Sequence, residues 1–364
     1  MKLEKKKVLI VSAHRPNRSP SQRFRYEQYI PFLEEHGYVF TYSYLISEKD
    51  DQFFYKKGYL IQKVAVLVKS VMIRFRDVLR ANKFDVVFIQ REAFMLGTSF
   101  FERLFSRKNP PIVFDFDDAI WFSNAEGGNK TLSFLKNPDK LKRIISLSDV
   151  VIAGNRYLYD YAKQFCEKTE IIPTTIDLSY HQLKEKKGTD ICIGWTGSFS
   201  TLPYFESLLP VLSKLKNEYS NLKFKVIVDV DRYYSEIMTH TTRWEKESEI
   251  DELNSISIGI MPIPNDEWAK GKCGFKGLQY MALKKACVMS AVGVNNEIID
   301  SGENGFLVKT DDQWYENLKL LIENEELRLV LGENGYQTIK NRYSVEANKI
   351  KYLTLFDSLL SCKK

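Results

Sequence analysis

The sequence predicts an α/β protein made of two doubly wound domains in tandem. Its 364 residues suffice for two domains of about 150 residues each. Short apolar runs alternate with helical patterns, which is typical of parallel sheets with helices on both faces. A polar, charged stretch over 179–190 separates two such series and reads as a linker.

The first series opens with an apolar run over 7–13, followed by a polar loop and a helical pattern over 26–36 that Gly37 ends. Later apolar runs with strand character, mostly separated by helical patterns, predict the remaining strands of this domain. These strands are expected at 39–45, 85–89, 112–116, 150–153 and 170–172.

The second series predicts a similar domain. Strands are expected at 191–198, 224–228, 256–263 and 286–291, with helices over 202–217 and near 274–283 and a Gly-punctuated stretch over 293–308. Apolar residues recur at helical spacing over 344–360, which predicts an amphipathic C-terminal helix that must pack against another element.

Composition excludes several classes of protein. Five cysteines without a CxxC pair argue against a disulfide framework and a zinc site, and favour a cytoplasmic protein. The net charge of +6 is too modest to imply nucleic acid as a partner. The apolar run near the N-terminus is shorter than a signal-peptide core and far short of the ~20 residues that span a membrane.

Two loops after strands of the second domain are suited to an anion. Gly197 and Ser198 end the motif GWTGS, where backbone N–H groups can approach a phosphate at a helix start; an ordinary tight turn is the alternative. Further on, glycines interleave three lysines at a probable helix N-terminus, which suits a diphosphate better than a merely solvated loop. These lysines are Lys270, Lys272 and Lys276.

The run KGLQYMALKKACV, then AVGVNNEII, then GENGFLV resembles the donor-binding region of GT-B glycosyltransferases, specifically the retaining family-four group that builds bacterial polysaccharides. Blocks of the first domain, among them SPSQRFRYEQYIPFLEEHGY, FDVVFIQREAF and VFDFDDAIW, resemble the same group in the same order. The resemblance implies GT-B architecture: two Rossmann-like domains facing across a cleft, with the C-terminal helix packing back on the first. The implied bounds are 1–178 for the acceptor domain, 179–189 for the linker, 190–343 for the nucleotide-sugar domain and 344–364 for the C-terminal helix.

The resemblance also assigns donor contacts. Lys276 falls where a diphosphate ligand is expected, and Gln279 falls where the family carries the Glu that binds the nucleotide ribose. Gly271 replaces the family's first Glu, while Gly293 and Glu297 match its Gly-Gly-x-x-Glu segment. An amide can still hydrogen-bond a ribose hydroxyl, so we expect Gln279→Glu to preserve or strengthen donor binding; a helix-surface position without a ligand is the alternative.

Acceptor-side candidates follow strands of the first domain. Asp117 and Asp118 are expected to contact the donor sugar or an acceptor hydroxyl, and a metal site shared by Asp115 and Asp117 is the less favoured reading. Three arginines could bind acceptor or donor phosphate, although ordinary surface arginine is an equal alternative for each. They are Arg23, Arg25 and Arg91.

The segment 59–83 predicts an amphipathic helix with its apolar flank on the sheet and a basic face in solvent. Twelve basic and four acidic residues give the region 56–108 a charge of +8. Anionic membrane lipid is therefore a possible partner of the basic face, which would place the protein peripherally on the inner face of the cell membrane. The basic face consists of Lys69, Arg76, Arg80 and Lys83.

Together these observations predict a retaining glycosyltransferase that moves a sugar from a nucleotide-diphosphate sugar to a saccharide or lipid-linked saccharide in cell-surface polysaccharide synthesis, without a metal or other cofactor. The expected catalytic residues are Lys276, Asp117 and Asp118. Lys276, with Lys272 and the backbone at Gly197 and Ser198, is expected to stabilise the charge that develops on the departing phosphate. Two alternatives remain open: a nucleotide-sugar epimerase of the same fold, and a sugar-nucleotide-binding scaffold without activity.

Overall fold

The computed structural model describes residues 5–56, 58–121, 139–184 and 190–361. The chain divides into two compact units: unit 1 comprises Met1–Thr174 with Asn348–Lys364, and unit 2 comprises Thr175–Ala347. The division falls a few residues before the stretch expected as linker. Ile176 already belongs to unit 2, where its N–H donates to the Tyr343 carbonyl at 2.8 Å.

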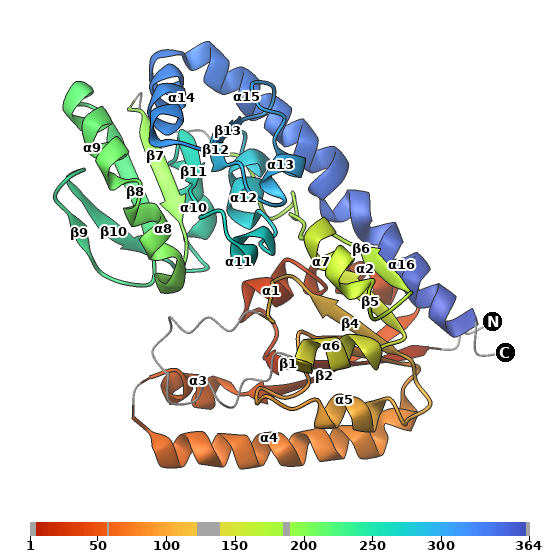
Figure 1. Ribbon diagram of the computed structural model, residues 1–364. Helices are drawn as coiled ribbons and strands as arrows, with labels where there is room; N and C mark the ends of the chain where they lie inside the picture. The colour runs from red at the N-terminus through yellow and green to blue at the C-terminus, as the bar shows by residue number, and fades with distance from the viewer. Residues whose placement is uncertain (1–4, 57, 122–138, 185–189, 362–364) are drawn as a thin grey trace. The chain divides into compact units, whose positions relative to one another are not determined.

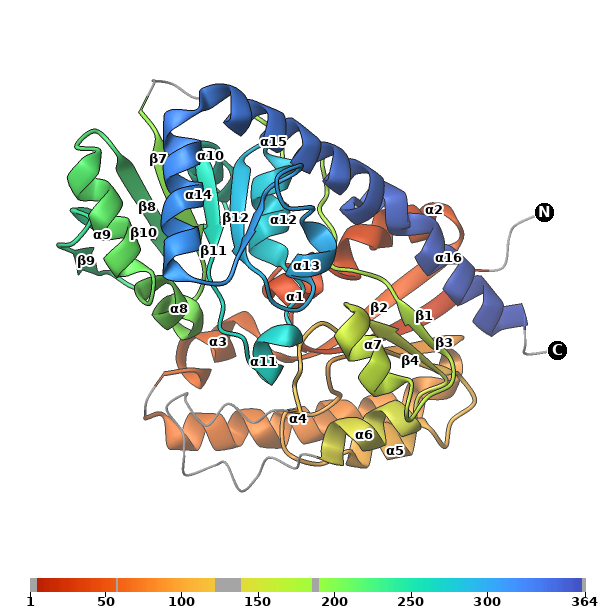
Figure 2. The same cartoon turned by 45° about the horizontal axis from the view of Figure 1, so that its top comes forward.

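Unit 1 contains a six-stranded parallel sheet in the order β2-β1-β3-β4-β5-β6. Its strands are β1 (Lys6–His14), β2 (Tyr38–Ile46), β3 (Val86–Gln90), β4 (Ile112–Phe116), β5 (Val150–Ala153) and β6 (Thr169–Ile171). Its helices are α1 (Pro20–Arg23), α2 (Ile30–Glu35), α3 (Glu48–Phe54), α4 (Leu60–Arg80), α5 (Phe100–Phe105), α6 (Asp139–Ser146), α7 (Arg156–Ala162) and α16 (Val345–Ser361), with 3-10 turns at Glu27–Tyr29 and Ala81–Lys83. Figures 1 and 2 show α4 and α5 on one face of this sheet and α2 and α16 on the other.

The C-terminal helix α16 packs on unit 1 through its apolar stripe. The rings of Tyr29 and Tyr352 lie 4.4 Å apart between centroids, and Phe356 meets the edge of Tyr38. Asp357 accepts a hydrogen bond from the Tyr38 hydroxyl at 2.7 Å at the margin of this contact. Burial of large aromatic side chains supplies most of the stabilisation in such a contact.

Unit 2 contains a seven-stranded sheet in the order β13-β12-β11-β7-β8-β10-β9, parallel except for the β9–β10 pair. Its strands are β7 (Cys192–Thr196), β8 (Lys223–Val228), β9 (Tyr233–Tyr234), β10 (Thr239–Arg243), β11 (Ile258–Met261), β12 (Ala286–Ser290) and β13 (Phe306–Val308). Its helices are α8 (Leu202–Glu206), α9 (Leu209–Glu218), α10 (Glu249–Asn254), α11 (Glu267–Lys270), α12 (Phe275–Ala282), α13 (Asn295–Ile298), α14 (Asp311–Glu323) and α15 (Glu325–Thr338), with a 3-10 turn at Phe199–Thr201 and a π-helical turn at Ile339–Tyr343.

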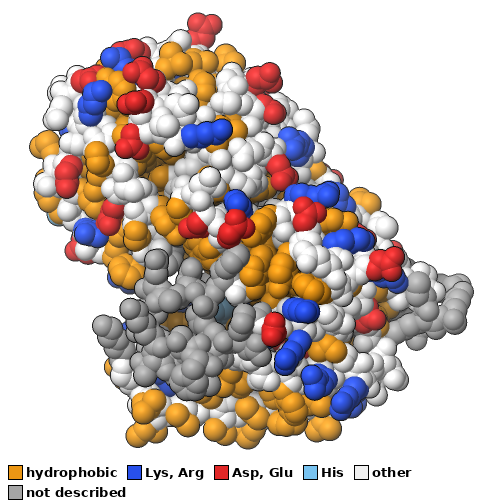
Figure 3. Space-filling view, viewed as in Figure 1, with side chains coloured by type: hydrophobic (Ala, Val, Ile, Leu, Met, Phe, Trp, Pro, Cys, Tyr) orange, Lys and Arg blue, Asp and Glu red, His pale blue; other side chains and the backbone are white. Residues whose placement is uncertain are grey.

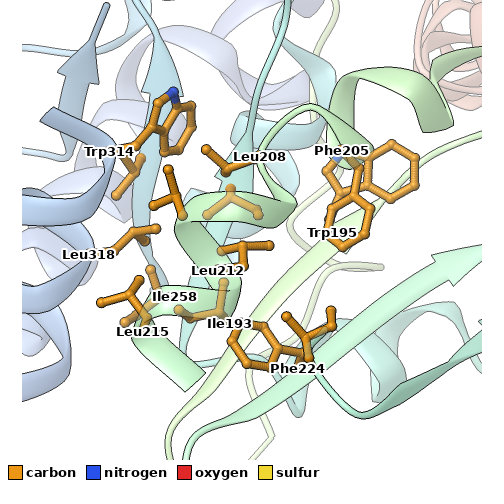
Figure 4. Close-up of a cluster of buried hydrophobic side chains, with 14 of the residues drawn as sticks. Ile193, Trp195, Phe205, Leu208, Leu212, Leu215, Phe224, Ile258, Trp314 and Leu318 are labelled. Atoms are coloured by element: carbon orange, nitrogen blue, oxygen red, sulfur yellow. The ribbon is translucent and has the colours of Figure 1, made fainter. Parts of the chain in front are cut away.

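One face of the unit 2 sheet is closed by α9 and α14, which pack against each other (Figure 1). Between them and the sheet lies a core of buried aliphatic and aromatic side chains, including Trp195, Leu212 and Trp314 (Figure 4). On the other face, α12 packs against β11 and β12. The strands expected from apolar runs are confirmed. Three strands were not expected: β9, which has two residues, β10, whose sequence THTTR is polar, and β13, which lies in the Gly-punctuated stretch.

One expectation about packing is wrong. Helix α4 forms where predicted, but its apolar flank is exposed and a different face lies against the sheet. The buried face carries the ion pair Arg74–Asp77, whose Nη1 and Oδ2 atoms are 2.9 Å apart and whose side chains are both fully buried.

Candidate functional site

Three loops meet at the carboxyl edge of the unit 2 sheet. Strands β12, β11 and β7 are parallel neighbours, so the loops that follow them emerge side by side. This is the edge at which open parallel sheets bind ligands. The loops carry most of the donor-binding residues expected from the sequence.

The loop after β7 holds Gly197 and Ser198. The Gly197 N–H donates to the Ile227 carbonyl at 3.0 Å, and a Cβ at Gly197 would lie 2.3 Å from the Trp195 ring, so the turn requires glycine. Ser198 is exposed and precedes the 3-10 turn, where its N–H donates to Thr201 Oγ1 at 3.2 Å.

Two glycines bring the other two loops into contact. Gly274 (φ +68°) precedes α12, and a Cβ there would lie 2.4 Å from Ile298, which follows β12. Gly293 (φ +53°) follows β12, and a Cβ there would lie 2.9 Å from the Lys270 backbone, in the loop after β11. Both glycines adopt the left-handed conformation and allow close backbone approach.

Lys272 and Lys276 flank the N-terminus of α12, and each lies over a tryptophan ring. Lys272 Nζ is 3.6 Å from the Trp268 ring centroid, and Lys276 Nζ is 5.4 Å from that of Trp195 on β7. The helix terminus and the two ammonium groups make this edge electropositive, which suits a phosphate group. The two tryptophans were not among the expected site residues, although Trp195 lies within the motif GWTGS.

Glu297 is exposed on the short helix α13 after β12. Its carbonyl accepts a hydrogen bond from Arg342 Nη2 at 2.9 Å. The structure thus brings Gly197, Lys272, Lys276 and Gly293 to one edge of the sheet, with Glu297 on the helix that follows Gly293.

Gln279 lies in α12 but is almost fully buried, so the alternative of a helix-surface position is wrong. Its Nε2 lies 3.3 Å from Glu249 Oε1, to which it donates, and 3.4 Å from His181 Nε2. Glu249 also accepts from Tyr180 Oη at 3.0 Å and from Trp244 Nε1 at 3.2 Å. This polar cluster was not predicted, because its members lie up to about a hundred residues apart and no local motif joins them.

In unit 1, Asp117 and Asp118 follow β4 beside Arg91, which follows β3. The Arg91 N–H donates to the Asp115 carbonyl at 2.8 Å, its φ is +63°, and its Nη2 lies 3.5 Å from Asp118 Oδ2. Burial raises the pKa of Asp117 to about 6, although the positive charge of Arg91 opposes this shift. Burial lowers the pKa of Arg91, but the charges of Asp117 and Asp118 outweigh it and the net shift is upward.

Arg25 is wrong as a phosphate or acceptor contact. Its side chain is fully buried and forms an ion pair with Asp115, and its Nη1 donates to the Ile172 carbonyl at 2.6 Å. Asp115 is equally buried in this pair, which occupies the carboxylate proposed as a metal ligand. Within the described part of the chain, no group of three or more His, Cys, Asp or Glu side chains is placed to hold a metal ion. Arg23 is also mostly buried, with its guanidinium 4.8 Å from the Phe24 ring centroid.

Residues 244–338 match the family model for glycosyl transferases group 1, a segment that includes the loops after β11 and β12. Among curated proteins, none has a significantly similar sequence.

Solved structures are similar over nearly the whole chain. Sucrose-phosphate synthase from Thermosynechococcus elongatus has a TM-score of 0.70 at 12% identity, over 99% of this chain and 100% of the synthase chain. A glycosyltransferase from Rickettsia africae has a TM-score of 0.67 at 13% identity, over 98% of this chain and 99% of its own. HepE from Anabaena, in complex with UDP and glucose, has a TM-score of 0.64 at 13% identity, over 98% of this chain and 100% of its own. The chain has the GT-B fold, and the family match supports a glycosyltransferase.

Proposed function

We propose that this chain is a retaining glycosyltransferase that moves a sugar from a nucleotide-diphosphate sugar to a saccharide or lipid-linked saccharide, in the synthesis of a cell-surface polysaccharide. The observation that carries the proposal is the meeting of three loops at the carboxyl edge of the unit 2 sheet. There Lys272 and Lys276 lie at the N-terminus of α12, beside loops whose backbones come close together at glycines.

This edge suits the chemistry of the leaving group. When the bond between the anomeric carbon and the phosphate oxygen breaks, negative charge develops on the β-phosphate, and the departing nucleotide diphosphate keeps the electron pair. Lys272 and Lys276 would stabilise that charge. The N–H groups of Gly197 and Ser198 already donate to the Ile227 carbonyl and to Thr201 Oγ1, so we do not assign them this role. The acceptor oxygen forms the new bond on the same face of the sugar and gives its proton to the departing phosphate. In this proposal the lysines take the place that a metal ion would have.

A solved structure with a similar fold guides the choice of donor. HepE was solved with UDP and glucose and with UDP-glucose. We therefore place UDP-sugars first among the donors to be tested, with the diphosphate at Lys276 and the nucleotide towards Gly293 and Glu297.

In unit 1, we assign the acceptor side to the cluster after β3 and β4. Asp117 would accept a hydrogen bond from the acceptor hydroxyl. Arg91 pairs with Asp118, and its positive charge offsets the negative charges of both aspartates. Arg23 stays a candidate contact for an acceptor phosphate. A carboxylate that orients the hydroxyl raises the fraction of bound acceptor that is aligned for reaction.

The test has two stages. A thermal-shift screen across UDP, GDP, TDP and CMP sugars identifies the donor by the stabilisation that binding confers. This donor, prepared with a labelled sugar, is then incubated with the protein and lipid-linked saccharides. Label in the lipid fraction is expected, and the anomeric configuration of the product, read by NMR, should match that of the donor.

Other outcomes would overturn the proposal. Conversion of the donor into another nucleotide sugar without an acceptor would establish the epimerase. Donor binding with no transfer to any lipid-linked acceptor would favour the inactive scaffold, and inversion at the anomeric carbon would exclude the retaining mechanism.

A further inference from the structure

Helix α4 presents a continuous apolar row to solvent. Six side chains on one face are exposed, most strongly Ile61 at 83% and Leu79 at 81%. We call this row the outer stripe; it consists of Ile61, Val64, Val68, Met72, Phe75 and Leu79. Its spacing of three and four residues keeps it on one side of the helix over its whole length. Figure 3 shows hydrophobic side chains gathered along the lower edge of the molecule, where α4 lies in Figure 1.

The stripe cannot turn inward, because the opposite face of α4 is fixed by polar contacts. Arg74 is fully buried; its Nη1 donates to Ser43 Oγ at 3.0 Å, its Nη2 to the Ser12 carbonyl at 2.6 Å and its Nε to the Ala93 carbonyl at 2.5 Å. Rotating the helix to bury the stripe would break these three bonds, because their acceptors lie outside α4, and would carry the Arg74–Asp77 pair away from them. The buried Ser12 and Ala93 carbonyls would lose their Arg74 donor, and leaving buried polar groups unsatisfied is destabilising, so the outward orientation is part of the fold.

The charges beside the stripe are positive. At 100° per residue, Lys69, Arg76 and Arg80 lie along one flank of the stripe, and Lys83 follows the helix. The sole acidic residue between 59 and 83 is Asp77, which is fully buried. Arg80 and Lys69 are engaged with Asp77 and Asp50, whereas Arg76 is 63% exposed with its Nη2 3.9 Å from Asp77.

Exposed apolar and aromatic residues extend the stripe. Tyr59 and Leu60 are exposed where α4 begins. Phe100, at the start of α5, is also exposed and lies 6.1 Å from Phe75 between ring centroids. Aromatic rings of this kind are enriched where proteins meet the polar surface of a bilayer.

From these observations we propose that α4 is a membrane-docking helix: it lies parallel to an anionic lipid surface, with the outer stripe among the acyl chains and Arg76 and Lys83 at the phosphates. No helix within the described residues is long and apolar enough to cross a membrane, and α4 itself carries charges along its length. An amphipathic helix with a basic flank binds such a surface by apolar burial together with attraction to anionic headgroups. This inference differs from the expected role of α4, in which the basic face alone met the lipid, and it does not depend on the proposed transfer reaction.

The test uses the full chain and vesicles made of equal parts phosphatidylglycerol and phosphatidylcholine. Wild type should co-sediment with these vesicles and bind pure phosphatidylcholine more weakly. The triple variant Ile61→Gln/Met72→Gln/Leu79→Gln should lose at least about tenfold in binding at both low and high salt, since three inserted side chains are removed. The variant Arg76→Gln/Lys83→Gln should lose only the low-salt advantage, because salt screens that attraction.

The matched control is Met238→Gln/Leu329→Gln, which removes two comparably exposed apolar side chains in unit 2 and should bind like wild type. All variants should melt like wild type, since the substituted side chains are exposed. Equal binding by wild type and the triple variant would overturn the proposal, as would equal binding to the two kinds of vesicle. A wild-type dimer in sedimentation velocity that the triple variant converts to a monomer would instead assign the stripe to a contact between copies.

Discussion

The side-chain amide of Gln279 donates to the carboxylate of Glu249 across 3.3 Å, with both side chains almost fully buried. This contact gives a physical reason for an amide where the resembling enzymes carry Glu. A second carboxylate at position 279 would face Glu249 inside unit 2, with His181 as its other neighbour. Gln279 is thus matched to its surroundings, and its replacement has consequences for stability before any for ligand binding.

We therefore predict that Gln279→Glu destabilises the protein at neutral pH, a consequence that the family pattern, which concerns donor binding, does not include. Removing the donor leaves a buried acceptor unsatisfied, which costs about 1–3 kcal/mol, and a like charge adds to this. Urea unfolding measures the change in the free energy of unfolding. The same exchange at Gln337, an exposed amide that donates to Glu333 at 2.9 Å, should cost far less because solvent screens the charges.

The variant Gln279→Leu separates the two roles of this amide. It also removes the bond to Glu249, so a loss of stability is expected without added repulsion. Donor affinity is measured at a temperature where the variant is folded. An affinity equal to that of wild type would make Gln279 a structural residue. A loss of affinity for nucleoside and nucleotide alike would support a contact between Gln279 and the ribose.

Lys276→Ala should weaken binding of UDP much more than binding of uridine. A hydrogen bond to a charged group contributes about 1.5–3 kcal/mol, which corresponds to roughly tenfold or more in affinity. Isothermal titration with both ligands measures this. Lys223→Ala is the matched control, since Lys223 is exposed at the first residue of β8, the opposite end of the same sheet. Equal losses for UDP and uridine would show that Lys276 does not contact the phosphates.

Strand positions and the two-unit organisation follow from hydrophobic patterns, but the orientation of α4 does not. Apolar spacing in that helix normally indicates the buried face, and it predicts the wrong face here. The decisive contacts join Arg74 to Ser43 and to the Ser12 carbonyl, and neither partner is evident from the helix sequence. In the same way, the sequence around Arg25 is that of an ordinary loop arginine. Its partner Asp115, on β4, lies ninety residues further along the chain.

Activity is expected to fall as the pH drops below about 6 if Asp117 acts as a carboxylate, because burial raises its pKa to about 6. The transfer rate at saturating substrates, measured from pH 5 to 8 with about one-unit steps, checks this. Asp117→Asn should lower the rate strongly, and the residual rate should lack the acidic limb, whereas Asp118→Asn should keep the limb. A flat profile in the wild type would contradict the role.

The raised pKa of Asp117 also predicts how the stability of the protein depends on pH. Its pKa is higher in the folded protein than in the unfolded chain, so the folded state binds more protons between about pH 4 and 6. The stabilisation that comes from the protonated form is therefore present at low pH and is lost as the pH rises through about 6. Urea unfolding of wild type and Asp117→Asn at pH 5 and pH 7 should show a smaller pH dependence from this source in the variant.

Arg25→Met should be strongly destabilising, because it leaves Asp115 charged and buried without its partner. Breaking a buried ion pair on one side costs about 3–5 kcal/mol, whereas an exposed pair contributes about 0–1 kcal/mol. Arg156→Met, which breaks a pair with Asp160 whose side chains are 62% and 56% exposed, is the matched control and should change the free energy of unfolding little. The double variant Arg25→Met/Asp115→Leu should recover part of the loss, since the uncompensated charge is gone, although the bond from Arg25 to the Ile172 carbonyl is not restored. If Arg25 instead binds the acceptor, Arg25→Met would unfold like wild type and raise the KM for the acceptor.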